Sequence, residues 1–167
     1  MRVDVHKEDS DTESRYLQWS ADDKGKIRYE GPTKIETNKW YDVAVVLDDS
    51  KSGSDRIALY VNGVKETLQY SSGTPDDLKN INLTSNFYIG QSDSKRRLNG
   101  AISYARIWTK ALTEQQVADQ SGKILNEETE GMIANWLFNN GNGNTKSFVS
   151  LAEKSFEAEA GSVVSTW

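Results

Sequence analysis

The sequence contains no cysteine and a single histidine, His6. Without cysteine the chain has no disulfides, no thiolate metal ligands and no cysteine nucleophile, although this absence leaves the cellular compartment open. The lone histidine is interpreted as a surface residue, and it argues against histidine-based triads and multi-histidine metal sites. No apolar run approaches the roughly 18 residues that a membrane span needs. Residues 1–8 do not resemble a signal peptide, so we expect any export signal to lie outside this chain.

Positive charge is also scarce, with 20 lysine and arginine residues against 25 acidic ones and a net charge of −5. That sign is unfavourable for binding a phosphate backbone, so nucleic acid is not an expected partner. The basic cluster at residues 95–97 lies in a turn-like polar stretch, and we interpret it as a solvated loop. The length of 167 residues suits one domain spanning residues 1–167.

Short β-rich runs separated by clusters of Gly, Asn, Asp and Ser dominate the chain, which is typical of an all-β sandwich or barrel. In residues 41–47 every second residue is apolar, beginning with Tyr41, which predicts a central strand. Residues 56–61 repeat this alternation, and we expect the two strands to be neighbours. The expected strands are 15–20, 26–30, 40–48, 56–62, 64–70, 86–91, 100–109 and 131–138.

Two local signals are sharper than the strand pattern. Asn62-Gly63 lies between two apolar runs and supplies the two positive-φ residues that a type I′ hairpin turn requires. Thr113, followed three residues later by Gln116, predicts a capping box at the start of a short surface helix. Gly122 is the expected end of that helix, after about two turns.

Several segments follow one another in a familiar order and spacing: 38–48 (NKWYDVAVVLD), 57–64 (IALYVNGV), 87–90 (FYIG), 98–108 (LNGAISYARIW) and 111–117 (ALTEQQV). Together with the tail 131–143 (GMIANWLFNNGNG), they resemble the concanavalin A-like, laminin G-like domains of bacterial extracellular proteins. The resemblance implies a two-sheet antiparallel β-sandwich of the jelly-roll type. It also implies a location outside the cytoplasm or at the cell surface.

The resemblance further implies a non-catalytic binding module, and carbohydrate is the leading ligand class. The alternative is a protein-interaction, adhesion or structural module that binds a cell-surface protein. A glycoside hydrolase is the third and least favoured hypothesis. Glycoside hydrolysis needs two carboxylates at a defined separation. The nearest approach is Glu157 and Glu159 on one expected strand face, but Ala158 replaces the acid that glucanases carry between them.

The segment before Trp40 is shorter than in most such domains, as if one or two N-terminal strands were missing. An open sheet edge would then favour a homodimer or an adjoining domain. Alternatively, strands from residues 147–167 fill the gap.

Aromatic residues are the first candidates for ligand contact, because sugars stack their apolar faces on exposed rings. Trp19 and Tyr29 lie in polar strands where hydroxyl groups would find hydrogen-bond partners, so we predict them as ligand-binding residues. Trp40, Trp108 and Trp136 lie in apolar strand patterns and are expected in the core.

Two polar loops are further candidates. The oxygen-rich loop at residues 48–55 suggests a structural calcium site with Asp48, Asp49 and Asp55 as ligands, although it lacks a bidentate glutamate. A solvated hairpin loop is the commoner structure for such a sequence. The second loop follows the tail motif, where relatives often carry an acidic pair. Its amides are predicted to bind sugar hydroxyls or to supply carbonyl ligands, the residues being Asn139, Asn140 and Asn142.

Overall fold

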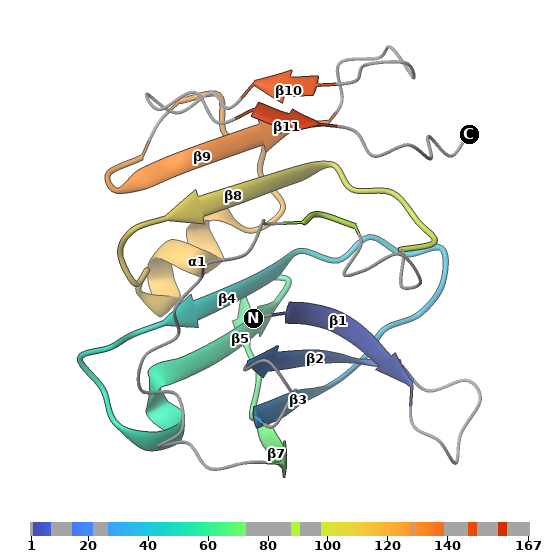
Figure 1. Ribbon diagram of the computed structural model, residues 1–167, viewed down its shortest axis with the longest axis vertical. Coiled ribbons are helices and arrows are strands. Elements are labelled where there is room, and N and C mark those ends of the chain that lie inside the picture. The colour runs from blue at the N-terminus through green and yellow to red at the C-terminus, as the bar shows by residue number, and fades with distance from the viewer. Residues whose placement is uncertain are drawn as a thin grey trace. The chain divides into compact units, whose positions relative to one another are not determined.

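The computed structural model describes residues 2–7, 15–21, 27–72, 88–90, 98–127, 129–138, 147–149 and 157–159, with side chains in 29–69, 88–90, 98–127 and 129–138. The described chain is mostly β-strand, and every paired strand is antiparallel (Figure 1). Contacts group the chain into two compact units, residues 1–86 with 111–122, and residues 87–110 with 123–167.

The first unit contains two sheets. One has the order β1-β2-β3-β7, and the other has the order β4-β5-β6. Their strands are β1 (Arg2–Lys7), β2 (Arg15–Ala21), β3 (Ile27–Lys34), β7 (Gln69–Ser72), β4 (Val43–Leu47), β5 (Ile57–Val61) and β6 (Val64–Lys65). A short 3-10 helix, η1 (Gly53–Arg56), precedes β5.

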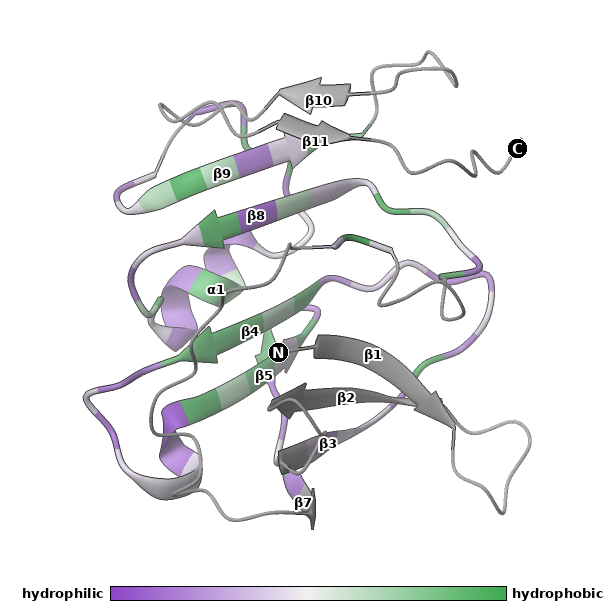
Figure 2. Cartoon of the chain, viewed as in Figure 1, coloured by the Kyte–Doolittle hydropathy of each residue, from purple (hydrophilic) through white to green (hydrophobic). Residues whose placement is uncertain are grey.

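The core of this unit lies between the two sheets. Tyr29 of β3 clusters with three residues of β5, namely Ile57, Leu59 and Val61, all of them buried. Val45 and Leu47 are alternate residues of β4 and pack against the same cluster, as does Tyr41, which precedes the strand. Val43 belongs to the same predicted alternation but is 41% exposed. Figure 2 shows the resulting concentration of hydrophobic residues on β4 and β5. These two strands pair along their whole length, which confirms the prediction that they are neighbours.

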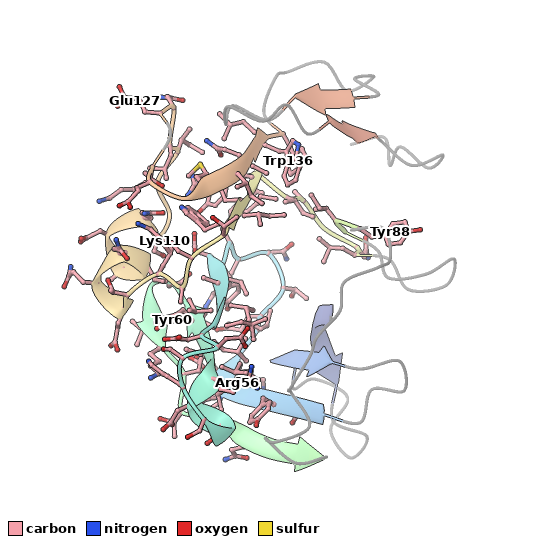
Figure 3. The ribbon with its side chains drawn as sticks, turned by 60° about the vertical axis from the view of Figure 1, so that its left-hand side comes forward. Arg56, Tyr60, Tyr88, Lys110, Glu127 and Trp136 are labelled. Atoms are coloured by element: carbon pink, nitrogen blue, oxygen red, sulfur yellow. The ribbon has the colours of Figure 1, made fainter. Side chains whose placement is uncertain are left out.

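The β5–β6 hairpin turn and helix α1 lie close together in the first unit. Asn62 and Gly63 have φ of 52° and 78°, which confirms the predicted positive-φ hairpin between β5 and β6. Helix α1 (Glu114–Gln120) packs against this hairpin through the backbone around Ala118. Burial of the Tyr60 side chain and the charge of Glu114 raise the pKa of Tyr60, which is labelled in Figure 3.

The capping box of α1 is confirmed in full. The Thr113 hydroxyl accepts the Gln116 backbone N–H at 3.2 Å, and the Gln116 side-chain oxygen accepts the Thr113 N–H at 2.9 Å. The helix stops at Gln120, and Gly122 follows with φ of 67°. The Gly122 N–H then donates to the Asp42 carboxylate at 3.0 Å, so the helix end is tied to the start of β4.

The second unit contains the paired strands β8 (Tyr104–Trp108) and β9 (Met132–Leu137), and the pair β10 (Ser147–Val149) and β11 (Glu157–Glu159). Its buried side chains include Met132, Ala134, Asn135 and Trp136 on β9. Among the described strands, β10 and β11 pair with each other. In the described part of that sheet, β1 and β7 stand at the edges.

Three strand predictions need correction. The strand predicted over 64–70 is two strands in different sheets, because Glu66 turns toward β3, where its carboxylate accepts the Thr33 N–H and hydroxyl at 2.9 and 2.6 Å. Residues 88–90 are not in a strand, since Gly90 has φ of 76° and its carbonyl accepts the Leu98 N–H. Finally, β1 was not predicted.

Candidate binding site

The segment between β3 and β4 forms a compact turn, residues 36–41, here called the Trp40 turn. Asn38 sits at its tip with φ of 61°, a conformation that asparagine tolerates better than most residues. The Glu36 backbone N–H donates to the Tyr41 hydroxyl at 3.1 Å, and the Tyr41 ring packs against the core cluster. The turn is therefore anchored to the interior of the first unit by one aromatic side chain.

Trp40, the residue before that anchor, is 67% exposed. This corrects the prediction that Trp40 belongs to the core. The reason is positional: Trp40 precedes β4, which begins at Val43, and Tyr41 takes the core-facing place beside it. The outcome is a large apolar side chain held in solvent on a braced turn.

The turn that carries Trp40 also contains an exposed ion pair. The Lys39 ammonium donates to a Glu36 carboxylate oxygen at 2.8 Å, and both side chains are more than half exposed. The hydrogen bond that Lys39 donates to the Glu36 carboxylate raises the pKa of Lys39 above its ordinary value. The Trp40 turn thus contains an exposed apolar ring, a hydrogen-bond donor and an acceptor.

The other predicted aromatics fall differently. Tyr29 is 1% exposed and lies in the core cluster, which corrects its prediction as a ligand-stacking residue. Its strand is polar in sequence, but this position faces β5. Trp19 stands directly opposite Tyr29 in the β2–β3 register, and opposed positions share one face of a sheet. The side chain of Trp19 lies outside the described side chains. Trp136 is buried as predicted, and Trp108 is partly buried with its indole N–H donating to Thr129.

The carboxylates of the loop at 48–55 are engaged locally. One Asp48 oxygen accepts the Ser50 N–H at 3.1 Å and its hydroxyl at 2.6 Å, and these bonds lower the pKa of Asp48. Asp49 pairs with Arg56, while Asp55 lies in the first turn of η1. Within the described ranges, no three acidic or histidine side chains are grouped as metal ligands. The calcium site of Asp48, Asp49 and Asp55 stays a prediction.

Asn139, Asn140 and Asn142 lie outside the described residues, so their role stays a prediction. The described backbone of β11 includes Glu157 and Glu159, the pair considered for hydrolysis.

A polar network in the second unit was missed by sequence reasoning. Arg106 and Asn135 are opposed on β8 and β9, and the Arg106 Nε–H donates to the Asn135 side-chain oxygen at 3.4 Å. Arg106 also donates to the Lys123 carbonyl, and Asn135, 1% exposed, donates to the Leu125 carbonyl at 2.8 Å. The Arg106 guanidinium lies 3.9 Å from the centroid of the Tyr104 ring. The network binds the segment after α1 to this sheet, and the signal for it was two polar residues in otherwise apolar strands.

A model of the concanavalin A-like lectin/glucanases superfamily matches residues 4–118, which is more than two thirds of the chain. The chain belongs to this superfamily. Membership identifies the fold as the laminin G-like, concanavalin A-like β-sandwich and the general role as that of a lectin-like binding module. No curated protein and no solved structure matches this chain. Among the described residues, no helix has the length and apolar character to cross a membrane.

Proposed function

We propose that this superfamily member is a non-catalytic carbohydrate-binding module and that the Trp40 turn makes its principal ligand contact. The observation that carries the proposal is the 67% exposure of Trp40. Isolated exposed apolar residues are common on proteins and need no explanation by themselves. Trp40 differs because its turn is braced by the Glu36–Tyr41 hydrogen bond, with Tyr41 packed in the core.

A braced tryptophan suits sugar recognition on physical grounds. The apolar C–H face of a pyranose covers an indole ring and removes both surfaces from water. Because the turn is already ordered, little conformational entropy is lost when the ligand binds. Glu36 and Lys39 stand within the same turn and supply polar groups for the hydroxyls at the edge of the sugar ring.

Two further parts of the proposal concern chemistry and location. A glycosidase needs two carboxylates across the scissile bond, whereas the Trp40 turn contains a single carboxylate, Glu36, already paired with Lys39. Binding without catalysis is therefore the better fit. We place the module outside the cytoplasm or at the cell surface, in keeping with the common location of laminin G-like domains.

A protein-interaction role is the second candidate, and one observation favours it. Val43 and Val64 flank Val61 in a cross-strand row of the β4-β5-β6 sheet, and they are 41% and 67% exposed. This surface would contribute apolar area to a protein interface.

The test is a glycan array probed with the purified chain, with and without calcium, alongside size-exclusion chromatography. We expect saturable glycan binding that Trp40→Ala weakens about 5- to 150-fold, the equivalent of a stacking contact of roughly 1–3 kcal/mol. Tyr88→Ala is the matched control, because Tyr88 is an exposed aromatic residue in the second unit. A folded chain that binds no glycan would refute the proposal and favour the protein-interaction role, for which a dimer on the column is direct support.

A further inference from the structure

The ion pair of the Trp40 turn restricts the class of ligand further than the exposed indole does. Glu36 and Lys39 meet at 2.8 Å across the tip of the turn, and Lys39 immediately precedes Trp40. An exposed pair of this kind contributes little to folding stability, since both charges are well solvated when apart. Because the pair lies in the same short turn as the exposed ring, a role in contact with a ligand is the use that its place in the chain favours.

The hydrogen-bonding capacity of the pair is only partly used by its own contact. A lysine ammonium has three donors and a carboxylate has two oxygens, and their mutual bond takes one donor and one oxygen. The remaining groups offer donors and an acceptor at neighbouring points. A hydroxyl is both donor and acceptor, so two adjacent hydroxyls would satisfy the ammonium and the carboxylate together.

An acidic sugar fits the same surface poorly. Its carboxylate would have to compete with Glu36 for Lys39 and would bring a second negative charge close to Glu36. The net charge of −5 adds a general repulsion of anionic glycans.

We infer, on the basis of the proposed function, that the ligand of the Trp40 turn is a neutral pyranose. Two adjacent hydroxyls of this sugar bind Glu36 and Lys39, while its apolar face covers Trp40. The inference concerns the class of sugar, which the exposure of Trp40 leaves open.

The experiment compares neutral hexose oligosaccharides with uronic-acid and sialylated oligosaccharides of matched length by calorimetric titration of the full chain. Wild type should bind the neutral probes, and Glu36→Gln and Lys39→Met should each weaken that binding about tenfold, the usual effect of removing a charged hydrogen-bond partner. Lys65→Met is the matched control, since it removes an exposed lysine from β6, outside the turn. Unchanged melting temperatures establish that the variants are folded.

Two results would overturn the inference and leave the proposed function standing. One is binding to acidic probes alone that Trp40→Ala abolishes. The other is neutral-sugar binding that depends on Trp40 and is the same in Glu36→Gln, Lys39→Met and wild type. If the folded wild-type chain binds none of the probes, the proposed function itself is wrong. This result differs from the two above, so failure of the inference and failure of the proposed function can be told apart.

Discussion

The contact between α1 and the β5–β6 hairpin can be tested with two glycine-to-alanine substitutions. Gly63 and Gly122 have similar positive φ values, 78° and 67°, so alanine at either position costs roughly 1–2 kcal/mol of backbone strain. The surroundings differ. A Cβ at position 63 would lie 3.1 Å from the Ala118 Cα and 3.0 Å from the Ser121 Cβ, whereas a Cβ at position 122 would meet nothing within 4 Å.

The expected magnitudes follow from that difference. Alanine restricts the unfolded chain and recovers about 0.4–1 kcal/mol, which leaves Gly122→Ala destabilised by about 1 kcal/mol. Overpacking against the helix backbone adds about 1–3 kcal/mol, so Gly63→Ala should lose about 2–4 kcal/mol in the free energy of unfolding. Gly122→Ala therefore measures the free-energy cost of placing alanine at a positive φ. The additional loss of stability in Gly63→Ala measures the steric overlap between the new Cβ and α1.

The assay is urea denaturation followed by tryptophan fluorescence. With a slope of about 2 kcal/mol per molar urea, the two midpoints should differ by about 0.5–1.5 M, and the slopes should agree. Equal midpoints for the two variants would refute the reasoning, because they would mean that the helix does not approach the hairpin as closely as described.

Three other perturbations probe the remaining features. Glu66→Ala should lower the free energy of unfolding by about 2–4 kcal/mol, because the Thr33 N–H and hydroxyl lose their hydrogen-bond acceptor. Glu66→Gln should restore part of this loss in the same denaturation assay. Hydrogen bonds from Ser50 lower the pKa of Asp48 in the folded protein. Ionised Asp48 therefore stabilises the fold above the pKa of about 3.9 that it has in the unfolded chain, and this stabilisation is lost as the pH falls through the lower pKa of the folded state. Melting temperature should accordingly fall less between pH 5 and pH 2.5 in Asp48→Asn than in wild type, and parallel curves would contradict this. Because Asp48 and Asp49 already have partners, we expect EDTA to leave the melting temperature unchanged, and a clear fall would instead support a calcium site.

Features that depend on a few consecutive residues were predictable. The Asn62-Gly63 turn formed as expected because its positive φ values are a property of those two residues. The capping box of Thr113 and Gln116 likewise requires only local spacing. The β4–β5 pair was predictable because its alternation is strong and the connection between the strands is short.

The candidate site was not predictable in the same way. Alternation assigns residues to two faces of a strand, but it does not say which face meets the other sheet. Tyr29 therefore looked like a surface residue among polar neighbours, although its face meets β5, and Trp40 looked like core, although Tyr41 takes the inward place. The break between β6 and β7 also depends on a distant partner, because Glu66 bonds to Thr33 of β3.

The amino-acid sequence by itself determined the fold class, the superfamily, the hairpin turn and the helix cap, since each depends on local spacing or on an ordered series of motifs. Tertiary structure alone decided that Tyr29 is buried and that Trp40 is exposed. Burial is a relation between segments distant in sequence, and it is settled only when the sheets pack against each other. For this reason the exposure of Trp40, which carries the proposed binding site, became apparent only in the structure, where Tyr41 is the residue that packs against the core.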